Sequence, residues 1–350
     1  MDTSTFRILD TLSSSIGDPL SINQLTERIR KTHGTAYYAN IYQKLQDLKD
    51  QDLLTLDPIG RSSSIKLNFR NYLLIDALAE MELRKKRNFL ERKRNLLPLL
   101  IEMNTAFNDA DFIKTIAATF PEKNLKLNRI ELLFLIAQTP NHHKRTIEIC
   151  EEMQRLQNKH NIKTDSLILN KHDFQQFITT DEINPARESL GEKIILSGPQ
   201  AFYGQIKDIA ENTEIKVLRE ETKPLKIPNA DLTYNLNRFG YQEFGRPMTQ
   251  GRNISIEYVV TTLLLQDDTR LQEAAPVILA KNTFNSNVLA FLSKKFDTNA
   301  RLIGIMKILR EFKPTTETNE TIDLLNTFGS KEIPTDKKDV LSKLKLFNAL

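Results

Sequence analysis

The chain has 350 residues, which is long for one hydrophobic core and predicts two or three domains. Its hydrophobic fraction of 40% excludes global disorder, and its single cysteine, Cys150, excludes an intramolecular disulfide and a cysteine-rich zinc cluster. The net charge of +4 is too small to identify a ligand, so the positions of the charges are more informative than their sum.

The sequence also bears on localisation. No apolar run reaches the length of a membrane helix, and the first residues show no basic segment followed by an apolar one. A lone cysteine suits a reducing compartment. We therefore expect a cytoplasmic protein that contacts no membrane.

The first fifty residues predict three helices. The first covers residues 5–14, and Ser21 is a suitable N-cap for a second that ends near residue 33. A third is expected to open at Thr35 and to end between residues 50 and 52. In this third helix Ile41, Leu45 and Leu48 recur at helical spacing, which marks its buried face.

The following stretch, "LLTLDPIGRSSSIKLNF", predicts two short strands around a turn at residues 58–60. Three helices followed by a hairpin is the element order of a winged helix-turn-helix. Residues 5–70 resemble the winged-helix domains that are fused to nucleotidyltransferase-like domains in archaeal proteins. The matching stretches are "NIYQKLQDLKDQDLL", for the recognition helix and its exit, and "IGRSSSIKLNF", for the wing.

This resemblance implies double-stranded DNA as the partner. The third helix of a winged helix enters the major groove, and the wing follows the backbone or the adjacent minor groove. Asparagine and glutamine suit adenine edges, lysine suits phosphate or guanine, and arginine suits phosphate or a narrow minor groove. The predicted DNA-binding residues are Tyr37, Asn40, Gln43, Lys44, Arg61 and Lys66.

Residues 71–97 predict one long helix, and the part from Glu82 to Arg94 is the most basic stretch of the chain. Such a run is often only a solvated helix face. The alternative is a helix that contacts phosphates or links two copies of the chain into a homodimer. We assign residues 73–108 to a separate basic linking segment.

Residues 109–220 predict a small mixed α/β domain. Strands are expected at 111–120, 129–137 and 164–170, with a helix at 144–160 between the second and the third. A helix at "DFQQFITT" is expected to follow, and then a fourth strand and a helix within "PARESLGEKIILSGPQAFYGQI". The region resembles the minimal nucleotidyltransferase fold, and the best match is the stretch "HDFQQFITTDEINPARESLGEKIILSGPQAFYGQI". The resemblance implies a Gly-Ser turn and an Asp-x-Asp pair in active members. The turn approaches the phosphates, and the two carboxylates hold divalent metals.

This chain departs from that pattern. The turn position falls on "TFPEKNLK", which has no glycine, and the carboxylate positions fall on Arg129 and Glu131. Asp165 matches the third carboxylate of the family. We expect these three residues to be remnants of a nucleotide site, with no catalytic residue, no metal and no cofactor. The histidines add no zinc-ligand spacing.

The remaining residues, 221–350, predict a connector followed by an all-α domain. Pro276 is expected to kink or break a helix, and the polar stretch 314–321 is expected to separate two helices. The predicted fold class is therefore a multidomain α+β protein. Its predicted segments are 1–72, 73–108, 109–220 and 221–350.

The leading hypothesis is a DNA-binding protein that regulates transcription and carries a catalytically inactive nucleotidyltransferase-like domain. One alternative is an active nucleotidyltransferase that modifies a protein or RNA, with Glu131 and Asp165 in an altered metal site. The other alternative is a protein-interaction adaptor, whose winged helix binds a protein in place of DNA.

Overall fold

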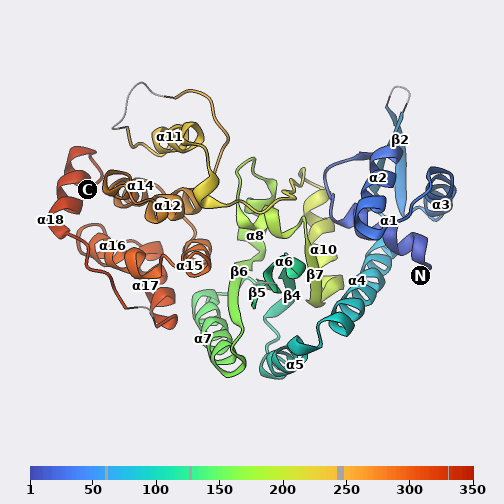
Figure 1. The fold of residues 1–350 in the computed structure, drawn as a ribbon, viewed down its shortest axis with the longest axis horizontal. Helices are drawn as coiled ribbons and strands as arrows, with labels where there is room; N and C mark the ends of the chain where they lie inside the picture. The colour runs from blue at the N-terminus through green and yellow to red at the C-terminus, as the bar shows by residue number, and fades with distance from the viewer. Residues whose placement is uncertain (60–61, 126–127, 243–247, 330) are drawn as a thin grey trace. The chain divides into compact units, whose positions relative to one another are not determined.

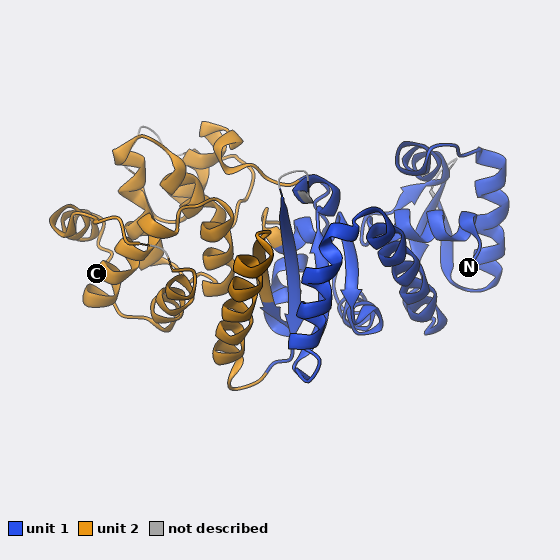
Figure 2. Cartoon of the chain, turned by 60° about the horizontal axis from the view of Figure 1, so that its bottom comes forward, with its two compact units in different colours: residues 1–138, 169–180, 186–220 blue, residues 139–168, 181–185, 221–350 orange. Residues whose placement is uncertain are grey.

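The computed structural model is an α+β protein with two small sheets (Figure 1). It describes residues 1–350 apart from 60–61, 126–127, 243–247 and 330. The chain divides into two compact units, which Figure 2 shows in blue and orange. The first comprises 1–138, 169–180 and 186–220; the second comprises 139–168, 181–185 and 221–350. The four segments proposed from the sequence stay a prediction.

The first three helices form where their patterns predict them. They are α1 (Thr3–Ser13), α2 (Ile22–His33) and α3 (Tyr38–Asp50). Ser21 caps α2 as expected: its hydroxyl accepts the Gln24 N–H at 3.2 Å, and the Gln24 side chain accepts the Ser21 N–H at 2.8 Å. This reciprocal capping box satisfies two backbone donors at the start of the helix.

The expected start of α3 at Thr35 is wrong, because the helix begins at Tyr38. The preceding residues are held outside the helix by side chains from α1 and α2. Arg7 donates to the carbonyl of Thr35 at 3.1 Å, and Arg30 donates to the carbonyl of Ala36 at 3.3 Å. These distant donors were not visible in the local sequence pattern.

The two predicted strands of the hairpin are confirmed and belong to a three-stranded antiparallel sheet, but the predicted turn at residues 58–60 is wrong at its first two positions. Pro58 and Ile59 pair with Ser63 and Ser62 at the end of the first strand, which is an edge strand, where a missing N–H is tolerated.

The strands of this sheet are β1 (Leu20–Ser21), β2 (Leu54–Ile59) and β3 (Ser62–Leu67), in the order β1-β3-β2. The two-residue β1 pairs Leu20 with Ile65. The sequence did not predict β1, because two residues are too few to show an alternating pattern.

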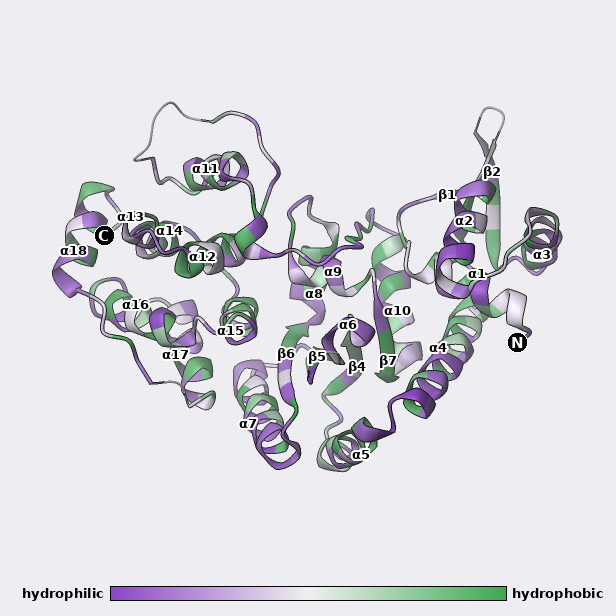
Figure 3. Ribbon diagram, viewed as in Figure 1, coloured by the Kyte–Doolittle hydropathy of each residue, from purple (hydrophilic) through white to green (hydrophobic). Residues whose placement is uncertain are grey.

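The prediction of a single helix over residues 71–97 is wrong. Helix α4 (Leu73–Arg92) ends before Lys93, and a 3-10 turn, η1 (Arg94–Leu96), leads into α5 (Leu97–Ala106). Pro98 explains the break, because it has no N–H to donate to a preceding carbonyl and its ring crowds the previous turn. Polar and apolar residues alternate along α4 (Figure 3), which contacts α1 of the same unit.

The second sheet has the strand order β6-β5-β4-β7. Its strands are β4 (Ile113–Thr119), β5 (Arg129–Ile136), β6 (Lys163–Asn170) and β7 (Lys193–Ser197). The four strands predicted here are confirmed. Strand β4 is antiparallel to both β5 and β7. Helix α4 contacts β7 and α10 within the first unit. The helices of this region are α6 (Pro121–Leu125), α7 (His142–His160), α8 (Lys171–Thr179), α9 (Pro185–Ser189) and α10 (Pro199–Ala210).

From residue 221 onward the described secondary structure is helical, apart from an isolated bridge between Ile254 and Ile183. The elements are η2 (Pro224–Lys226), α11 (Asn229–Arg238), α12 (Ile256–Leu265), α13 (Thr269–Gln272), α14 (Ala274–Lys281), α15 (Ser286–Lys295), α16 (Asn299–Phe312), α17 (Thr316–Thr327) and α18 (Lys337–Leu346). The predicted break precedes Pro276, which lies in the first turn of α14, where a missing N–H costs no hydrogen bond. Among the described residues, no helix is both long and apolar enough to cross a bilayer.

The polar stretch 314–321 is not a break, contrary to the prediction, because α17 runs through most of it. The Thr315 hydroxyl accepts the Thr318 N–H at 3.1 Å and caps the helix. Thr318 and Thr321 are buried, and the Thr321 hydroxyl bonds the carbonyl of Glu317. The buried residues at the start of this helix are thus threonines, in a stretch where threonine hydroxyls bond backbone groups. The stretch therefore lacks the apolar residues on which the prediction of a helix relied.

Candidate functional site

The outward face of α3 holds most of the predicted DNA-binding residues. Its apolar stripe is buried as predicted, with Ile41, Leu45 and Leu48 between 0% and 5% exposed. On the opposite side Asn40 and Gln43 are exposed. Neither of these two side chains makes a hydrogen bond within the described residues, so both amides are available to a ligand.

Lys44 does not stand free on this face as the sequence suggested. Its side chain is 24% exposed, and its ammonium lies 2.9 Å from an oxygen of Asp2 and 3.7 Å from an oxygen of Asp47. The hydrogen bond to Asp2 raises the pKa of Lys44. The charge of this lysine is therefore already partly neutralised, and contact with a phosphate would have to compete with Asp2.

The hairpin carries the other two predicted residues. Lys66 lies on β3, with its side chain 55% exposed and its ammonium 3.7 Å from an oxygen of Asp57 on β2. Cross-strand pairs this exposed are weak, so Lys66 can exchange its partner readily. Arg61 lies outside the described residues.

Tyrosines form the most prominent feature of α3 that sequence reasoning missed. Tyr37 was predicted and is 69% exposed, whereas Tyr38 and Tyr42 were not predicted and are 48% and 46% exposed. The rings of Tyr38 and Tyr42 stack with centroids 6.2 Å apart. Their spacing of four residues was the available signal, because such pairs are neighbours on a helix.

The predicted remnants of a nucleotide site occupy the second sheet. Arg129 and Glu131 lie on β5, with the Arg129 Nε atom 3.9 Å from a Glu131 oxygen, and the Glu131 side chain is 2% exposed. Asp165 is buried on β6, in a segment of the second unit. In the part of the chain that the structure describes, no group of three or more His, Cys, Asp or Glu side chains could hold a metal ion.

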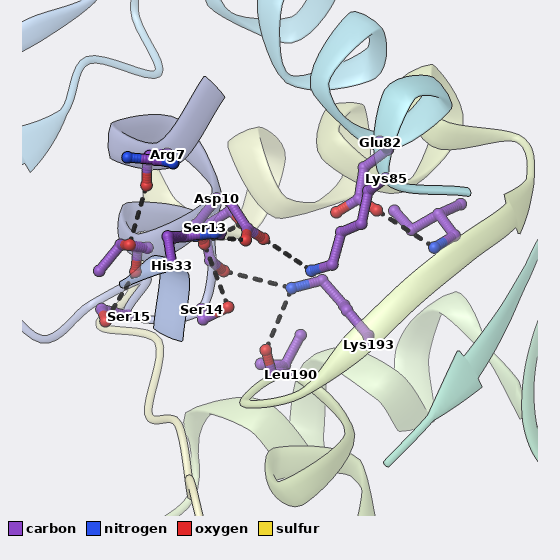
Figure 4. A network of polar contacts seen from close by, with 12 residues as sticks. Arg7, Asp10, Ser13, Ser14, Ser15, His33, Glu82, Lys85, Leu190 and Lys193 are labelled. Carbon is purple, nitrogen blue, oxygen red and sulfur yellow. Dashed lines mark hydrogen bonds and ion pairs between the residues drawn. The ribbon is translucent and has the colours of Figure 1, made fainter. Parts of the chain in front are cut away.

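A buried polar network of the first unit was not predicted at all (Figure 4). Asp10 on α1 is 8% exposed and accepts a hydrogen bond from the Lys85 ammonium at 2.7 Å. Its second oxygen lies 3.2 Å from Nε2 of His33. Burial alone would raise the pKa of Asp10, but Lys85 and His33 outweigh it and hold that pKa well below its ordinary value. Asp10 is therefore a buried carboxylate kept ionised by its partners.

Glu82 forms the second part of this network. It is fully buried on α4, where it accepts the Tyr203 hydroxyl at 2.8 Å and the Ile195 backbone N–H at 3.2 Å. Burial and the Glu82 charge raise the pKa of Tyr203 well above its ordinary value, so this phenol stays a donor. The carboxylate thereby ties α4 to β7 and α10.

Lys193 forms the third part. It is 1% exposed, and its ammonium donates to the carbonyls of Ser13 at 3.2 Å and Leu190 at 3.1 Å. Burial lowers the pKa of Lys193 to about 8 against the attraction of Glu82. The network therefore combines charged groups of both signs within the core of the first unit (Figure 4).

Sequence comparisons add no assignment to this geometry. No family model, no curated protein and no solved structure gives a significant match to the chain.

Proposed function

We propose that residues 1–72 form a winged helix-turn-helix that binds double-stranded DNA, and that the protein regulates transcription. The observation that carries this proposal is the two-sided character of α3. One side supplies buried aliphatic residues, and the other presents amide side chains that no described residue engages. The antiparallel hairpin β2–β3 follows α3 directly, as the wing follows the recognition helix.

We assign the contacts with the base edges of the DNA to Asn40 and Gln43. We expect Gln43→Ala to weaken binding to a preferred duplex by about 1–3 kcal/mol, because a bidentate amide contact to adenine is worth that much. Binding to random duplex should change little. Fluorescence anisotropy with a site selected from a random duplex library would measure both affinities.

Two further variants sharpen this test. Lys66→Ala should weaken binding to all duplexes alike and lower the slope of log affinity against log salt by roughly one. Gln176→Ala removes the same side chain from an exposed position of α8 and should leave DNA binding unchanged. Equal losses for Gln43→Ala on selected and random duplex would contradict base reading by α3.

The tyrosines of α3 favour a second candidate, a protein-interaction adaptor. Aromatic side chains are enriched at protein interfaces, and three exposed tyrosines lie within one and a half turns of Tyr38. The two lysines and two aspartates of α3 cancel in charge. If the protein fails to bind any duplex at low salt, this candidate replaces DNA binding.

We further propose that residues 109–220 form a nucleotidyltransferase-like domain without activity, and that residues 221–350 form a helical domain. Arg129 supports the first point, because a guanidinium at a metal position repels divalent cations. We expect no label transfer from nucleoside triphosphates with magnesium or manganese. Arg129→Asp combined with Glu131→Asp should not restore it, because the stretch 119–126 still lacks glycine.

Transfer of label by the wild-type chain would contradict the proposal that this domain is inactive. Incorporation of label into a protein or RNA by the wild-type chain, lost in Glu131→Gln, would show that the domain is an active nucleotidyltransferase. Retention of that label in Glu131→Gln would indicate a contaminating activity instead.

A further inference from the structure

A cavity of about 630 Å³ lies within the first unit, beside the buried polar network. Its walls come from α1 and α2, from α4, from the start of α6, from residues 191–194 and from Arg219. This volume falls in the range of small-molecule sites, roughly 300–1,000 Å³. None of the DNA-binding residues proposed above lines it.

The lining of the cavity is predominantly basic. Three acidic side chains contribute, namely Asp10, Glu122 and Glu192. Six basic side chains contribute besides His33: Arg28, Lys31, Lys85, Arg92, Lys193 and Arg219. The excess of positive charge inside a concave, low-dielectric wall favours an anion.

Part of this positive charge is already paired with other groups of the protein. Lys85 is paired with Asp10, Arg92 with Glu122 at 3.1 Å, and Lys193 donates to backbone carbonyls. Lys31 is exposed and forms no ion pair or hydrogen bond with any residue that the structure describes. The positive charge that no described residue neutralises therefore lies on α2, at Lys31.

Two guanidinium groups, those of Arg28 and Arg219, line the same cavity as Lys31 and repel each other electrostatically. Arg28 donates to the Ser15 hydroxyl at 2.8 Å, and Arg219 pairs with Asp18. Burial and the like charge of Arg219 lower the pKa of Arg28, which the charge of Asp18 only partly offsets. A bound anion would relieve this repulsion between the two guanidinium groups.

The backbone brings Arg219 to this place by a close approach. A Cβ atom on Gly191 would lie 2.3 Å from the carbonyl oxygen of Leu218, so only glycine permits the two segments to touch. Arg219 follows directly, and Gly191 itself lines the cavity. The close approach of the two main-chain segments therefore places the Cα atom of Arg219 against Gly191, at the wall of the cavity.

We propose that this cavity binds a small organic phosphate monoester, with its phosphate held by Arg28, Lys31 and Arg219. Guanidinium groups bind phosphate oxygens in a bidentate manner, and a phosphate monoester carries close to two negative charges at neutral pH. A carboxylate would supply only one. The volume left beyond a phosphate group has room for an organic part, for which Thr32 and Asn88 offer side chains without hydrogen bonds to described residues.

Isothermal titration calorimetry on the full chain, without DNA, tests this site. The probes are inorganic phosphate, AMP and glucose 6-phosphate, with adenosine and glucose as uncharged controls. We expect all three phosphates to bind and the two esters to bind more tightly, because they fill more of the cavity. The tighter of the two esters distinguishes a nucleotide from a sugar phosphate as the source.

Variants assign the binding to these residues. Arg28→Gln and Arg219→Gln should each weaken ester binding about 10-fold or more, the loss expected for a charge-assisted hydrogen bond. Lys31→Gln, which removes no contact within the described residues, should weaken it less and leave the thermal midpoint unchanged. Arg87→Gln removes an equal charge from a side chain that is 70% exposed and lies outside the cavity.

Three results would overturn the proposal. They are no heat of binding with any phosphate at millimolar concentration, tighter binding of inorganic phosphate than of either ester, and equal weakening by Arg87→Gln and Arg28→Gln. Since no DNA is present, each of these results is independent of whether α3 reads a duplex.

Discussion

Glu82→Ala should lower the free energy of unfolding by about 3–5 kcal/mol, because it leaves two buried donors without an acceptor. The Tyr203 hydroxyl and the Ile195 N–H both bond to the Glu82 carboxylate. The alanine also leaves a cavity on a face of α4 from which water is excluded. Urea unfolding followed by far-ultraviolet circular dichroism would measure the change.

Two other substitutions serve as references for that result. Glu91→Ala removes a carboxylate from the same helix, but this side chain is 64% exposed and its pairing with Arg87 spans 3.9 Å, so the cost should be below about 1 kcal/mol. Glu82→Gln retains one acceptor, so its loss in free energy of unfolding should lie between those of Glu82→Ala and Glu91→Ala. Similar values for Glu82→Ala and Glu91→Ala would show that the network does not stabilise the fold.

Lys193 should make stability depend on pH in the alkaline range. Its pKa of about 8 in the folded protein lies below the ordinary value of 10.5, because burial penalises the charged form. Between these two values the unfolded chain binds more protons than the folded one, so stability rises with pH. Relative to Lys193→Met, the wild-type protein should gain about 2 kcal/mol between pH 7 and pH 9.5.

The comparison with Lys193→Met cancels the titration of groups that do not interact with Lys193. Glu82, Lys85 and Asp10 do interact with it electrostatically and remain in both proteins. Unfolding curves at several pH values would show the pH range over which the difference in stability between the two proteins changes. As a reference, Lys49→Met removes an exposed lysine and should give a difference that is flat with pH. A flat difference for Lys193→Met as well would mean that this lysine keeps its ordinary pKa.

Local signals explain what the sequence predicted correctly. The capping box at Ser21, the stripe Ile41, Leu45 and Leu48, and the two strands of the hairpin all depend on neighbours within a few residues. The break after α4 also had a local signal in Pro98, which the prediction of one long helix overlooked. The helix α17 was missed because its first turn is polar and its caps are threonines.

The candidate sites were harder to predict because their partners are distant in sequence. The exposure of Asn40 and Gln43 on α3, and of Tyr37 directly before it, followed from the apolar stripe of that helix. The partner of Lys44, by contrast, is Asp2, in a different part of the chain. No short pattern relates Asp10 to Lys85, since a buried pair is defined only when two helices pack together.

The interleaving of the two units has a consequence for the order of events on the ribosome. Residues 139–168 of the second unit are synthesised before residues 169–220 complete the first. Glu82 precedes Ile195 by 113 residues. At typical translation rates Glu82 is therefore synthesised on the order of 10 s before the Ile195 N–H that its carboxylate accepts. During this interval the apolar face of α4 has neither β7 nor α10 to cover it, and the nascent chain presents a surface suited to chaperone binding.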